Sequence, residues 1–171
     1  MTLEFFTSDV LPLKDKLFRY AKSILNNEDL AKDVVQETML KIWEKRSEAD
    51  TIRNLEAWCM TVVRNFALSK YRLKDNQNST LEPGIEIAET SDSPYEKLER
   101  SDVIQQIDNI VSKLPVKLKE VFQLRDIEGY TYIEICEITG YELSDVKVCI
   151  FRARKTIKEN LTKIYAYEKY G

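Results

Sequence analysis

Apolar side chains recur every three or four residues along nearly the whole chain. This spacing matches the turn of an α-helix, whereas a half-buried strand would alternate apolar and polar residues, and no segment sustains such alternation. The first half predicts amphipathic helices over about residues 11–25, 28–46 and 54–73, the first ending at Asn26 and the third capped by Asn54. We therefore expect an all-α fold.

The faces of these helices predict which side chains are buried. On the second helix we expect Met39 and Trp43 in the core, while the acidic and amide side chains of Asp33, Gln36 and Glu37 lie on the other side. Those polar groups suit a solvated face or a partner surface, and composition does not decide between the two. On the third helix, the residues at helical spacing that we expect on the apolar face are Leu55, Trp58, Val62, Phe66 and Ser69.

The second half of the chain carries clear start and stop signals for helices. Segments 93–96 and 131–134 have the form of a capping box, in which Ser or Thr caps the helix and a Glu three residues later reaches back. We expect a helix to start at each box, the second stopping at Gly140, and another helix between them that starts at Pro115 and ends at Gly129. A further helix after Gly140 completes a helix-turn-helix.

A polar segment separates the two halves. It spans residues 76–93, has no helical periodicity and contains a Pro-Gly pair, so we expect a flexible linker between a domain of residues 1–75 and a domain of residues 94–171. The middle of the chain, which contains this linker, is acidic, because residues 76–112 carry 2 basic and 8 acidic groups. Fully extended, the linker reaches about 60 Å.

Basic residues gather outside this acidic middle. The whole chain has 26 Lys and Arg against 29 Asp and Glu, yet residues 53–74 carry a net charge of +4 and residues 146–163 a net charge of +5. Local basic surfaces on an acidic chain are typical of contacts with a polyanion, although a solvated helix face carries charge in the same way. In the first cluster Trp58, Phe66 and Tyr71 alternate with the cations, which suits stacking on unpaired bases; core packing explains Trp58 and Phe66 more simply.

The composition excludes most catalytic schemes. The chain of 171 residues has no histidine and only 4 glycines, so it can form neither a histidine-based triad nor a glycine-rich phosphate loop. The 3 cysteines form no CxxC pair; we expect Cys59 and Cys136 to be buried and Cys149 to be partly exposed. We predict a protein that is not an enzyme, needs no cofactor or metal, does not insert into a membrane and resides in the cytoplasm.

The last helix divides into two faces. Val146, Ile150, Ala153 and Ile157 form the expected buried stripe. The residues left for DNA or solvent are Ser144, Asp145, Lys147, Val148, Phe151, Arg152, Arg154 and Lys155. In a helix-turn-helix the second helix enters the major groove, where Arg and Lys near base edges can read guanine and those farther along neutralise phosphates.

Three segments together resemble a known family. Residues 29–43 (DLAKDVVQETMLKIW) closely resemble the conserved-region-2 helix of sigma-70-type sigma factors, residues 54–65 (NLEAWCMTVVRN) resemble the segment that opens the promoter's upstream hexamer, and residues 114–154 resemble region 4. The resemblance covers about residues 10–163 and points to the extracytoplasmic-function (ECF) group. It implies a region 2 helical bundle and a region 4 helix-turn-helix, joined by the acidic linker.

The resemblance also implies partners and site residues. It implies binding to core RNA polymerase at the β′ clamp and the β flap, to promoter DNA, and to an anti-sigma factor that is often bound to the membrane. The residues implied to bind core polymerase are Asp33, Gln36, Glu37, Leu40 and Trp43. Those implied at the −10 element are Arg53, Arg64, Asn65, Lys70, Tyr71 and Arg72. Those implied at the −35 element are Ser144, Asp145, Lys147, Val148, Arg152, Arg154 and Lys155.

Some positions depart from the family pattern. Cys149 stands where many relatives carry arginine, Phe151 replaces a frequent histidine, and Glu142 stands where a serine cap is usual. These departures leave base preference at −35 and the start of the last helix open. The main hypothesis is an alternative sigma factor that directs promoter recognition, strand opening and transcription initiation; the alternative is a helix-turn-helix regulator that binds duplex DNA without polymerase.

Overall fold

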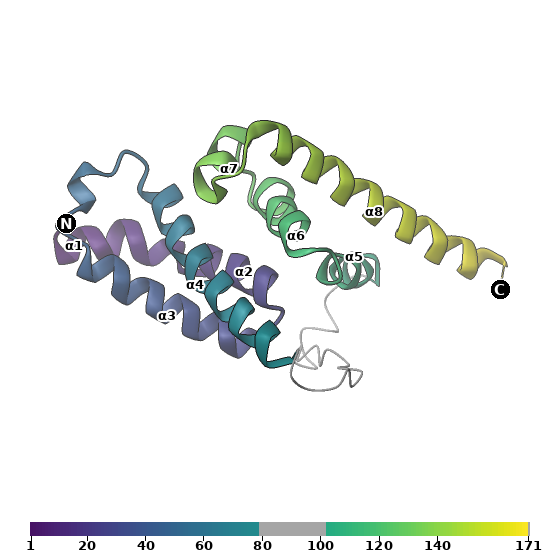
Figure 1. Ribbon diagram of the computed structural model, residues 1–171, viewed down its shortest axis with the longest axis horizontal. Coiled ribbons are helices and arrows are strands. Elements are labelled where there is room, and N and C mark those ends of the chain that lie inside the picture. Colours follow the sequence, from purple (N-terminus) through teal and green to yellow (C-terminus); the bar gives the residue numbers. More distant parts are fainter. Residues whose placement is uncertain (79–101, 171) are drawn as a thin grey trace. The chain divides into compact units, whose positions relative to one another are not determined.

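The computed structural model describes residues 1–78 and 102–170, and all regular elements in these two ranges are helical. The chain forms two compact units. The first is built on α1 to α4 and the second on α5, α6 and α8, with α7 leading into α8 through Gly140 (Figure 1). The expected all-α fold with two helical domains is confirmed.

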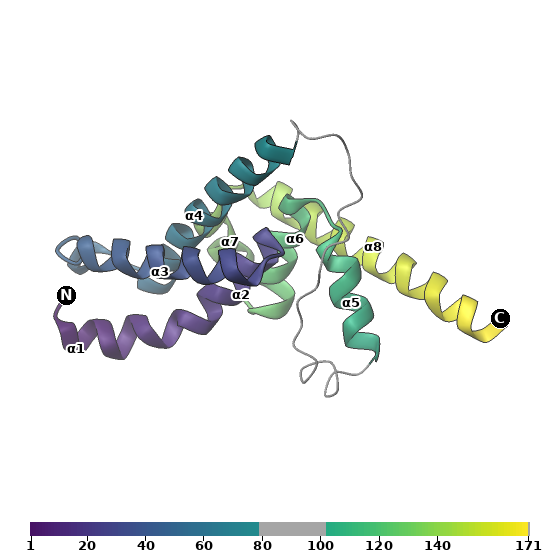
Figure 2. The ribbon, with the colours of Figure 1, turned by 90° about the horizontal axis from the view of Figure 1, so that it is seen from below.

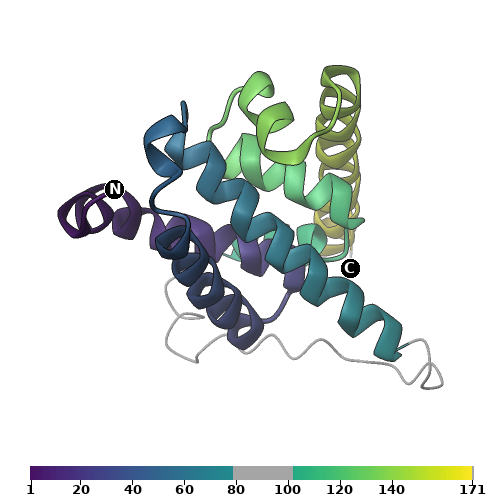
Figure 3. The ribbon, with the colours of Figure 1, turned by 60° about the vertical axis from the view of Figure 1, so that its left-hand side comes forward.

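Three long helices make the first unit: α2 (Lys14–Leu25), α3 (Glu28–Glu44) and α4 (Leu55–Asn78), each in contact with the other two (Figure 3). Three short turns accompany them: α1 (Leu3–Phe5), the π-turn η1 (Phe6–Val10) and the 3-10 turn η2 (Leu11–Leu13). A further 3-10 turn, η3 (Ala49–Thr51), lies between α3 and α4. The sequence pattern predicted the three long helices and missed the turns before residue 11.

Local side-chain signals set the helix ends in the first unit. Asn26 adopts the left-handed conformation at φ 50° and ends α2, as the sequence predicted. The side chain of Asn27 accepts a hydrogen bond from the Leu30 amide at 2.9 Å, and the side chain of Asn54 accepts one from the Ala57 amide at 3.0 Å. These two bonds satisfy amides that have no partner inside the helix.

The buried face of α4 differs from the predicted one. Ala57, Met60, Val63 and Ala67 are buried, whereas Trp58 and Phe66 are half-buried and Ser69 is exposed. The face is therefore rotated by about one residue from the expected stripe. The reason is that α4 packs against both α2 and α3, and small side chains fit such a contact better than the large aromatic ones.

The second unit is built on α5 (Asp102–Ser112), α6 (Val116–Phe122) with the π-turn η5 (Gln123–Ile127), and α8 (Leu143–Tyr170). The helix α7 (Tyr132–Thr139) comes between η5 and α8 in the chain. Figure 2 shows α5 and α6 against α8. Its core cluster consists of Ile110, Leu114, Phe122, Ala153 and Ile157. The core is thus assembled from elements that lie far apart in the sequence.

The helix-turn-helix has the predicted boundaries. The Thr131 amide donates to the Glu134 carboxylate at 2.8 Å, and the Glu134 amide donates to the Thr131 hydroxyl at 3.2 Å, which is a complete capping box. Gly129 and Gly140 have φ of +81° and +73°, values that favour glycine, after η5 and α7 respectively. The other expected capping box, at 93–96, lies outside the described residues.

The remaining predictions about boundaries and cysteines have mixed outcomes. α4 continues to Asn78, so the first three positions of the expected linker are helical, and the rest of that linker lies outside the described residues. Cys59 is buried as predicted. The predictions for the other two thiols are wrong: Cys136 is half-buried, and Cys149 is buried because it lies on the flank of the stripe formed by Val146 and Ile150.

None of the helices in the two described ranges combines the length and the apolar composition needed to cross a membrane.

Candidate functional surfaces

One surface lies along α3. Asp33, Gln36 and Leu40 are exposed and Glu37 is half-buried, and their spacing of three and four residues places them on one face, away from the buried Val34 and Ile42 side chains. Leu40 is 65% exposed and lies about one turn after Gln36 and Glu37 on the same face. The face therefore offers acidic groups at one end and apolar groups at the other. We define the α3 face as Asp33, Gln36, Glu37, Leu40 and Trp43.

Trp43 lies at the end of this face and is not the core residue expected from its periodicity. Its indole is half-buried, with the Phe6 ring edge-on at a centroid distance of 5.4 Å and an interplanar angle of 76°. The Arg46 guanidinium lies 4.7 Å from the centre of the indole and also donates a hydrogen bond to the Trp43 carbonyl at 3.0 Å. Met39, also expected in the core, is likewise half-buried, because Thr38 and Ile42 occupy the buried side of the helix.

The residues expected at the −10 element do not form a single stripe on α4. Asn65 and Arg72 are exposed and lie seven residues, or two turns, apart on one side. Arg64 and Tyr71 have the same spacing on another side and are half-buried. Arg53 precedes the helix and is exposed. The basic cluster therefore wraps around α4.

Lys70 turns toward α3. Its Nζ lies 3.1 Å from a carboxylate oxygen of Glu37, and the two side chains are 33% and 42% exposed. This ion pair joins a residue expected to bind DNA to a residue expected to bind polymerase. Sequence spacing gave no sign of it, because the two residues lie 33 positions apart on different helices.

The second surface is the outward side of α8. The predicted buried stripe of Val146, Ile150, Ala153 and Ile157 is confirmed. All the residues expected to contact the −35 element are exposed. The centre of the outward side is formed by Ser144, Lys147, Val148, Phe151 and Lys155, which we name the α8 face. Phe151 is 68% exposed and Val148 44%, so two apolar groups are accessible among the cations.

Two expected DNA contacts lie at the flanks of the α8 face and carry partners. Arg154 forms a bidentate ion pair with Asp126 of η5, with N–O distances of 2.9 and 2.6 Å. The hydrogen bonds to Asp126 raise the pKa of the Arg154 guanidinium. Asp145 pairs with Lys117 at 3.5 Å. Periodicity placed both residues correctly at the surface and could not reveal these pairs.

Lys117 is a site residue that the sequence analysis missed. It lies on α6, yet its ammonium pairs with Asp145 at the leading end of α8 and lies 4.5 Å from the centre of the Tyr141 ring. Tyr141 in turn donates a hydrogen bond to the Glu120 carboxylate. A cation thus supports the entry to α8 from a helix outside the helix-turn-helix motif. No local signal marks it, because Lys117 and Asp145 are far apart in sequence.

The start of α8 is defined by backbone bonding. The Glu142 carbonyl accepts the Val146 amide at 3.0 Å, and the helix begins at Leu143. The Glu142 side chain is exposed. Cys149 is buried and is not part of the α8 face.

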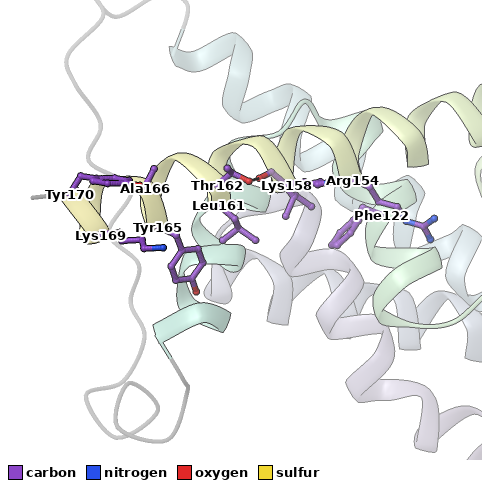
Figure 4. A pocket seen from close by; sticks show the side chains of 10 residues that line it. Phe122, Arg154, Lys158, Leu161, Thr162, Tyr165, Ala166, Lys169 and Tyr170 are labelled. Atoms are coloured by element: carbon purple, nitrogen blue, oxygen red, sulfur yellow. Dashed lines mark hydrogen bonds between the residues drawn. The ribbon is translucent and has the colours of Figure 1, made fainter.

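An open groove of about 660 Å³ runs along the C-terminal half of α8. Figure 4 shows Phe122, Leu161 and Tyr165 on one side of the helix, and Lys158 and Lys169 also line the groove. The groove is therefore apolar with basic groups in its lining.

Burial acts on two of the cysteine thiols. It raises the pKa of Cys59 to about 12 and also raises the pKa of Cys149, so both stay protonated near neutral pH. Within the described residues, no group of three or more Cys, Asp or Glu side chains could hold a metal ion.

Two known protein family models match the chain, one in each half. A family model described as Sigma-70 region 2 matches residues 10–77, and one described as Sigma-70, region 4 matches residues 104–157. The first match covers α2 to α4 and the second covers α5, α6, α7 and the first half of α8. Both surfaces lie inside the matched stretches.

Individual proteins are similar over most of their length. The chain is 27% identical over 156 residues to the ECF RNA polymerase sigma factor EcfG of Rhodopseudomonas palustris strain TIE-1, covering 87% of this chain and 81% of that protein. It is 29% identical over 153 residues to the RNA polymerase sigma factor SigV of Bacillus subtilis strain 168, covering 88% and 87%.

Solved structures are similar in fold. The sigma factor RpoE, in a complex with the anti-sigma factor NepR from Bartonella quintana, matches with a TM-score of 0.80 and 26% identity, covering 94% of this chain and 98% of that one. CnrH, in a complex with the cytosolic domain of CnrY, matches in fold with a TM-score of 0.70 and 22% identity, covering 95% and 90%.

Proposed function

Because the chain belongs to the sigma-70 family, in its ECF group, we propose that its two units divide the work of an alternative sigma factor between polymerase docking and promoter recognition. The observation that carries this proposal is the order of the two family matches along the chain, each including an exposed surface of the expected kind. The protein thereby directs core RNA polymerase to a promoter. Its own contribution is binding and strand opening, with no bond chemistry.

We assign core binding to the α3 face. Its exposed Leu40 and half-buried Trp43 supply apolar contact area, and Asp33 and Glu37 supply negative charge for a basic partner. The proposed partner segment is the β′ clamp of the polymerase. We assign the β flap to the groove along α8, whose apolar lining and lysines fit an apolar segment with acidic neighbours.

At the −10 element, we propose that exposed cations and half-buried aromatic residues act together. Arg53, Asn65 and Arg72 are accessible for the DNA backbone and base edges, and the half-buried Tyr71 ring can stack on an unpaired base. Such contacts offset the few kcal/mol needed to take a base out of the duplex. Arg64 and Lys70 complete the set from the other sides of α4.

At the −35 element, the α8 face enters the major groove. Lys147 and Arg152 can reach guanine edges, and Lys155 neutralises phosphate. Val148 and Phe151 are apolar and accessible, which fits contact with thymine methyl groups. Ser144 and Asp145 lie at the leading end, and Arg154 acts from its ion pair with Asp126.

We further propose an anti-sigma factor partner, membrane-bound or free, that covers these surfaces when the protein is inactive. The support is that RpoE and CnrH, which are similar in fold, were solved in complexes with an anti-sigma factor and with a cytosolic domain of a partner. The domain limits proposed from sequence, 1–75 and 94–171 with a linker at 76–93, give such a partner two separate surfaces. A protein that works on polymerase and DNA acts in the bacterial cytoplasm.

The direct test is reconstitution with core polymerase. Full-length protein and bacterial core enzyme are mixed, and the dissociation constant and promoter-dependent initiation are measured on a library of templates. We expect tight binding and initiation at promoters that share a −35 and −10 pair. DNA binding without core association would instead indicate the helix-turn-helix regulator.

A variant pair tests the assignment of the α3 face. Replacing Asp33 and Glu37 by lysine reverses the charge of the face without touching the core, so core binding should be lost while the helical content is kept. The matched control replaces Asp15 and Asp75, two exposed acids on α2 and α4 of the same unit, by lysine. Equal binding by both double variants would contradict the docking assignment.

A further inference from the structure

Phe6 makes a specific contact with the α3 face. It lies in η1, 37 positions before Trp43, and its ring meets the indole edge-on at 5.4 Å and 76°. Edge-to-face aromatic pairs are favoured by the ring quadrupoles and hold a preferred orientation. Phe6 itself is half-buried, whereas its neighbour Phe5 is 42% exposed. One of two adjacent phenylalanines is therefore used to contact the docking tryptophan.

Arg46 restrains the same indole. Its guanidinium lies 4.7 Å from the ring centroid, which is cation–π distance, and its hydrogen bond to the Trp43 carbonyl at 3.0 Å fixes the guanidinium near the end of α3. The indole is consequently in contact with an aromatic edge and a cation, while it stays half-buried at the surface. A side chain held in this way loses less conformational freedom when a partner binds.

Phe6 also lies before the stretch that the family model matches, which starts at residue 10. The contact thus adds to the α3 face a residue that the sigma-70 region 2 match does not include. Leu3 and Leu11, 67% and 42% exposed, lie in the flanking turns α1 and η2.

We infer that Phe6 and Arg46 are positioning residues that hold the Trp43 indole in its polymerase-binding orientation, so that η1, the turn that carries Phe6, is part of the docking surface. This inference rests on the proposed function, because it takes core polymerase as the partner of the α3 face. Phe6 acts through Trp43, by restricting the ring before the partner arrives.

The test compares two neighbouring phenylalanines in the full chain. Phe6→Leu keeps apolar volume and removes the ring edge, Phe6→Tyr keeps the ring, and Phe5→Leu is the matched control. All are made in a Trp58→Phe background, so that Trp43 is the only tryptophan in the sequence. The measurements are the emission maximum and anisotropy of Trp43 and the dissociation constant for core polymerase.

We expect Phe6→Leu to shift the Trp43 emission to longer wavelength, lower its anisotropy and weaken core binding by about three- to tenfold. The dissociation constants of Phe6→Tyr and Phe5→Leu should stay within about twofold of the parent value, because both variants keep an aromatic ring at position 6 against Trp43. An unchanged dissociation constant for Phe6→Leu, or an equal loss for Phe5→Leu, would overturn the inference.

A second variant keeps the test independent of folding. Arg46→Gln changes an exposed residue two positions after the end of α3, removes the cation from the indole and leaves the Phe6 contact in place. It should lower Trp43 anisotropy and weaken core binding to a smaller extent than Phe6→Leu. Wild-type affinity for Arg46→Gln, combined with loss of helical content in Phe6→Leu, would count against positioning. If the parent chain itself failed to bind core polymerase, the proposed function would fail instead.

Discussion

α4 and α8 are both long basic helices that carry aromatic residues, yet the side chains on their buried faces differ in size and shape. The buried residues of α4 are Ala57, Cys59, Met60, Val63 and Ala67. The buried residues of α8 are Val146, Cys149, Ile150, Ala153 and Ile157. Large β-branched residues thus mark the core side of α8, whereas small ones mark much of the core side of α4.

The difference follows from the number of neighbours that each helix must fit. α4 lies against α2 and α3 at once, and small side chains let helix axes approach closely. The displaced aromatic residues, Trp58 and Phe66, lie half-buried at the flank. The small residues on the core side of α4 therefore go with two aromatic side chains that stay partly accessible.

The largest predicted effect tests the α8 side of this comparison. Ile150→Ala removes a side chain that is 2% exposed, and we expect it to lower the free energy of unfolding of the second unit by about 2–5 kcal/mol. Val148→Ala, on the exposed face, should change it by less than about 0.5 kcal/mol. Urea denaturation followed by circular dichroism measures both. Similar losses for the two variants would mean that the faces of α8 are wrongly assigned.

The next prediction tests the α4 side. Ala67→Leu adds volume at a fully buried contact, so we expect about 1–3 kcal/mol of destabilisation of the first unit. Ser69→Leu, two residues later at an exposed position, should be nearly neutral. Both tryptophans lie in the first unit, so their fluorescence follows its unfolding. If Ala67→Leu left the stability unchanged, the buried face of α4 would instead be the one predicted from the sequence, which contains Trp58 and Phe66.

These two helices also show how far the sequence could be read. The start and stop signals predicted the capping box at Thr131 and the glycines after η5 and α7, because caps and left-handed turns depend on a few adjacent residues. Periodicity also predicted the buried stripe of α8. It failed on α4 by about one position, because the choice of buried face there depends on helices elsewhere in the chain.

The contacts that modify the candidate surfaces could not be predicted for the same reason. Phe6 meets Trp43, Lys70 meets Glu37, and Asp126 meets Arg154 across separations of 28 or more positions. Periodicity states which side of a helix a residue occupies, but it does not state which residue of another element lies opposite. The family resemblance supplied site residues without these partners.

Helix caps give a prediction of intermediate size in both units. Thr131→Ala removes one half of the capping box of α7, and Asn54→Ala removes the acceptor at 3.0 Å from the Ala57 amide at the start of α4. Each should cost about 0.5–2 kcal/mol, because a helix amide loses its partner. The glycine variants at the same positions should recover most of that loss. Chemical denaturation of the four variants tests this ranking, and an alanine variant as stable as its parent would show that the cap is dispensable.

The smallest predicted effects concern the two ion pairs that involve expected DNA-binding residues. In a double-mutant cycle with Glu37→Gln and Lys70→Gln, we expect a coupling energy of about 0.2–1 kcal/mol that falls as salt is raised, because both side chains are about one-third or more exposed. The cycle with Asp126→Asn and Arg154→Gln should lie at the upper end of this range, since that pair is bidentate. Urea denaturation at low and high salt measures both.

The order of these two coupling energies has a consequence for binding. A weak Lys70–Glu37 pair can open at little cost, so the α3 face and the basic surface of α4 can each take a partner without hindering the other. In the proposed −35 interface, the Arg154–Asp126 pair keeps its guanidinium at the flank of the α8 face, so phosphate contacts would fall mainly to Lys155. If the Lys70–Glu37 coupling proved the larger of the two, polymerase binding at Glu37 would release Lys70 toward DNA at a measurable cost, and the two surfaces of the first unit would be energetically linked.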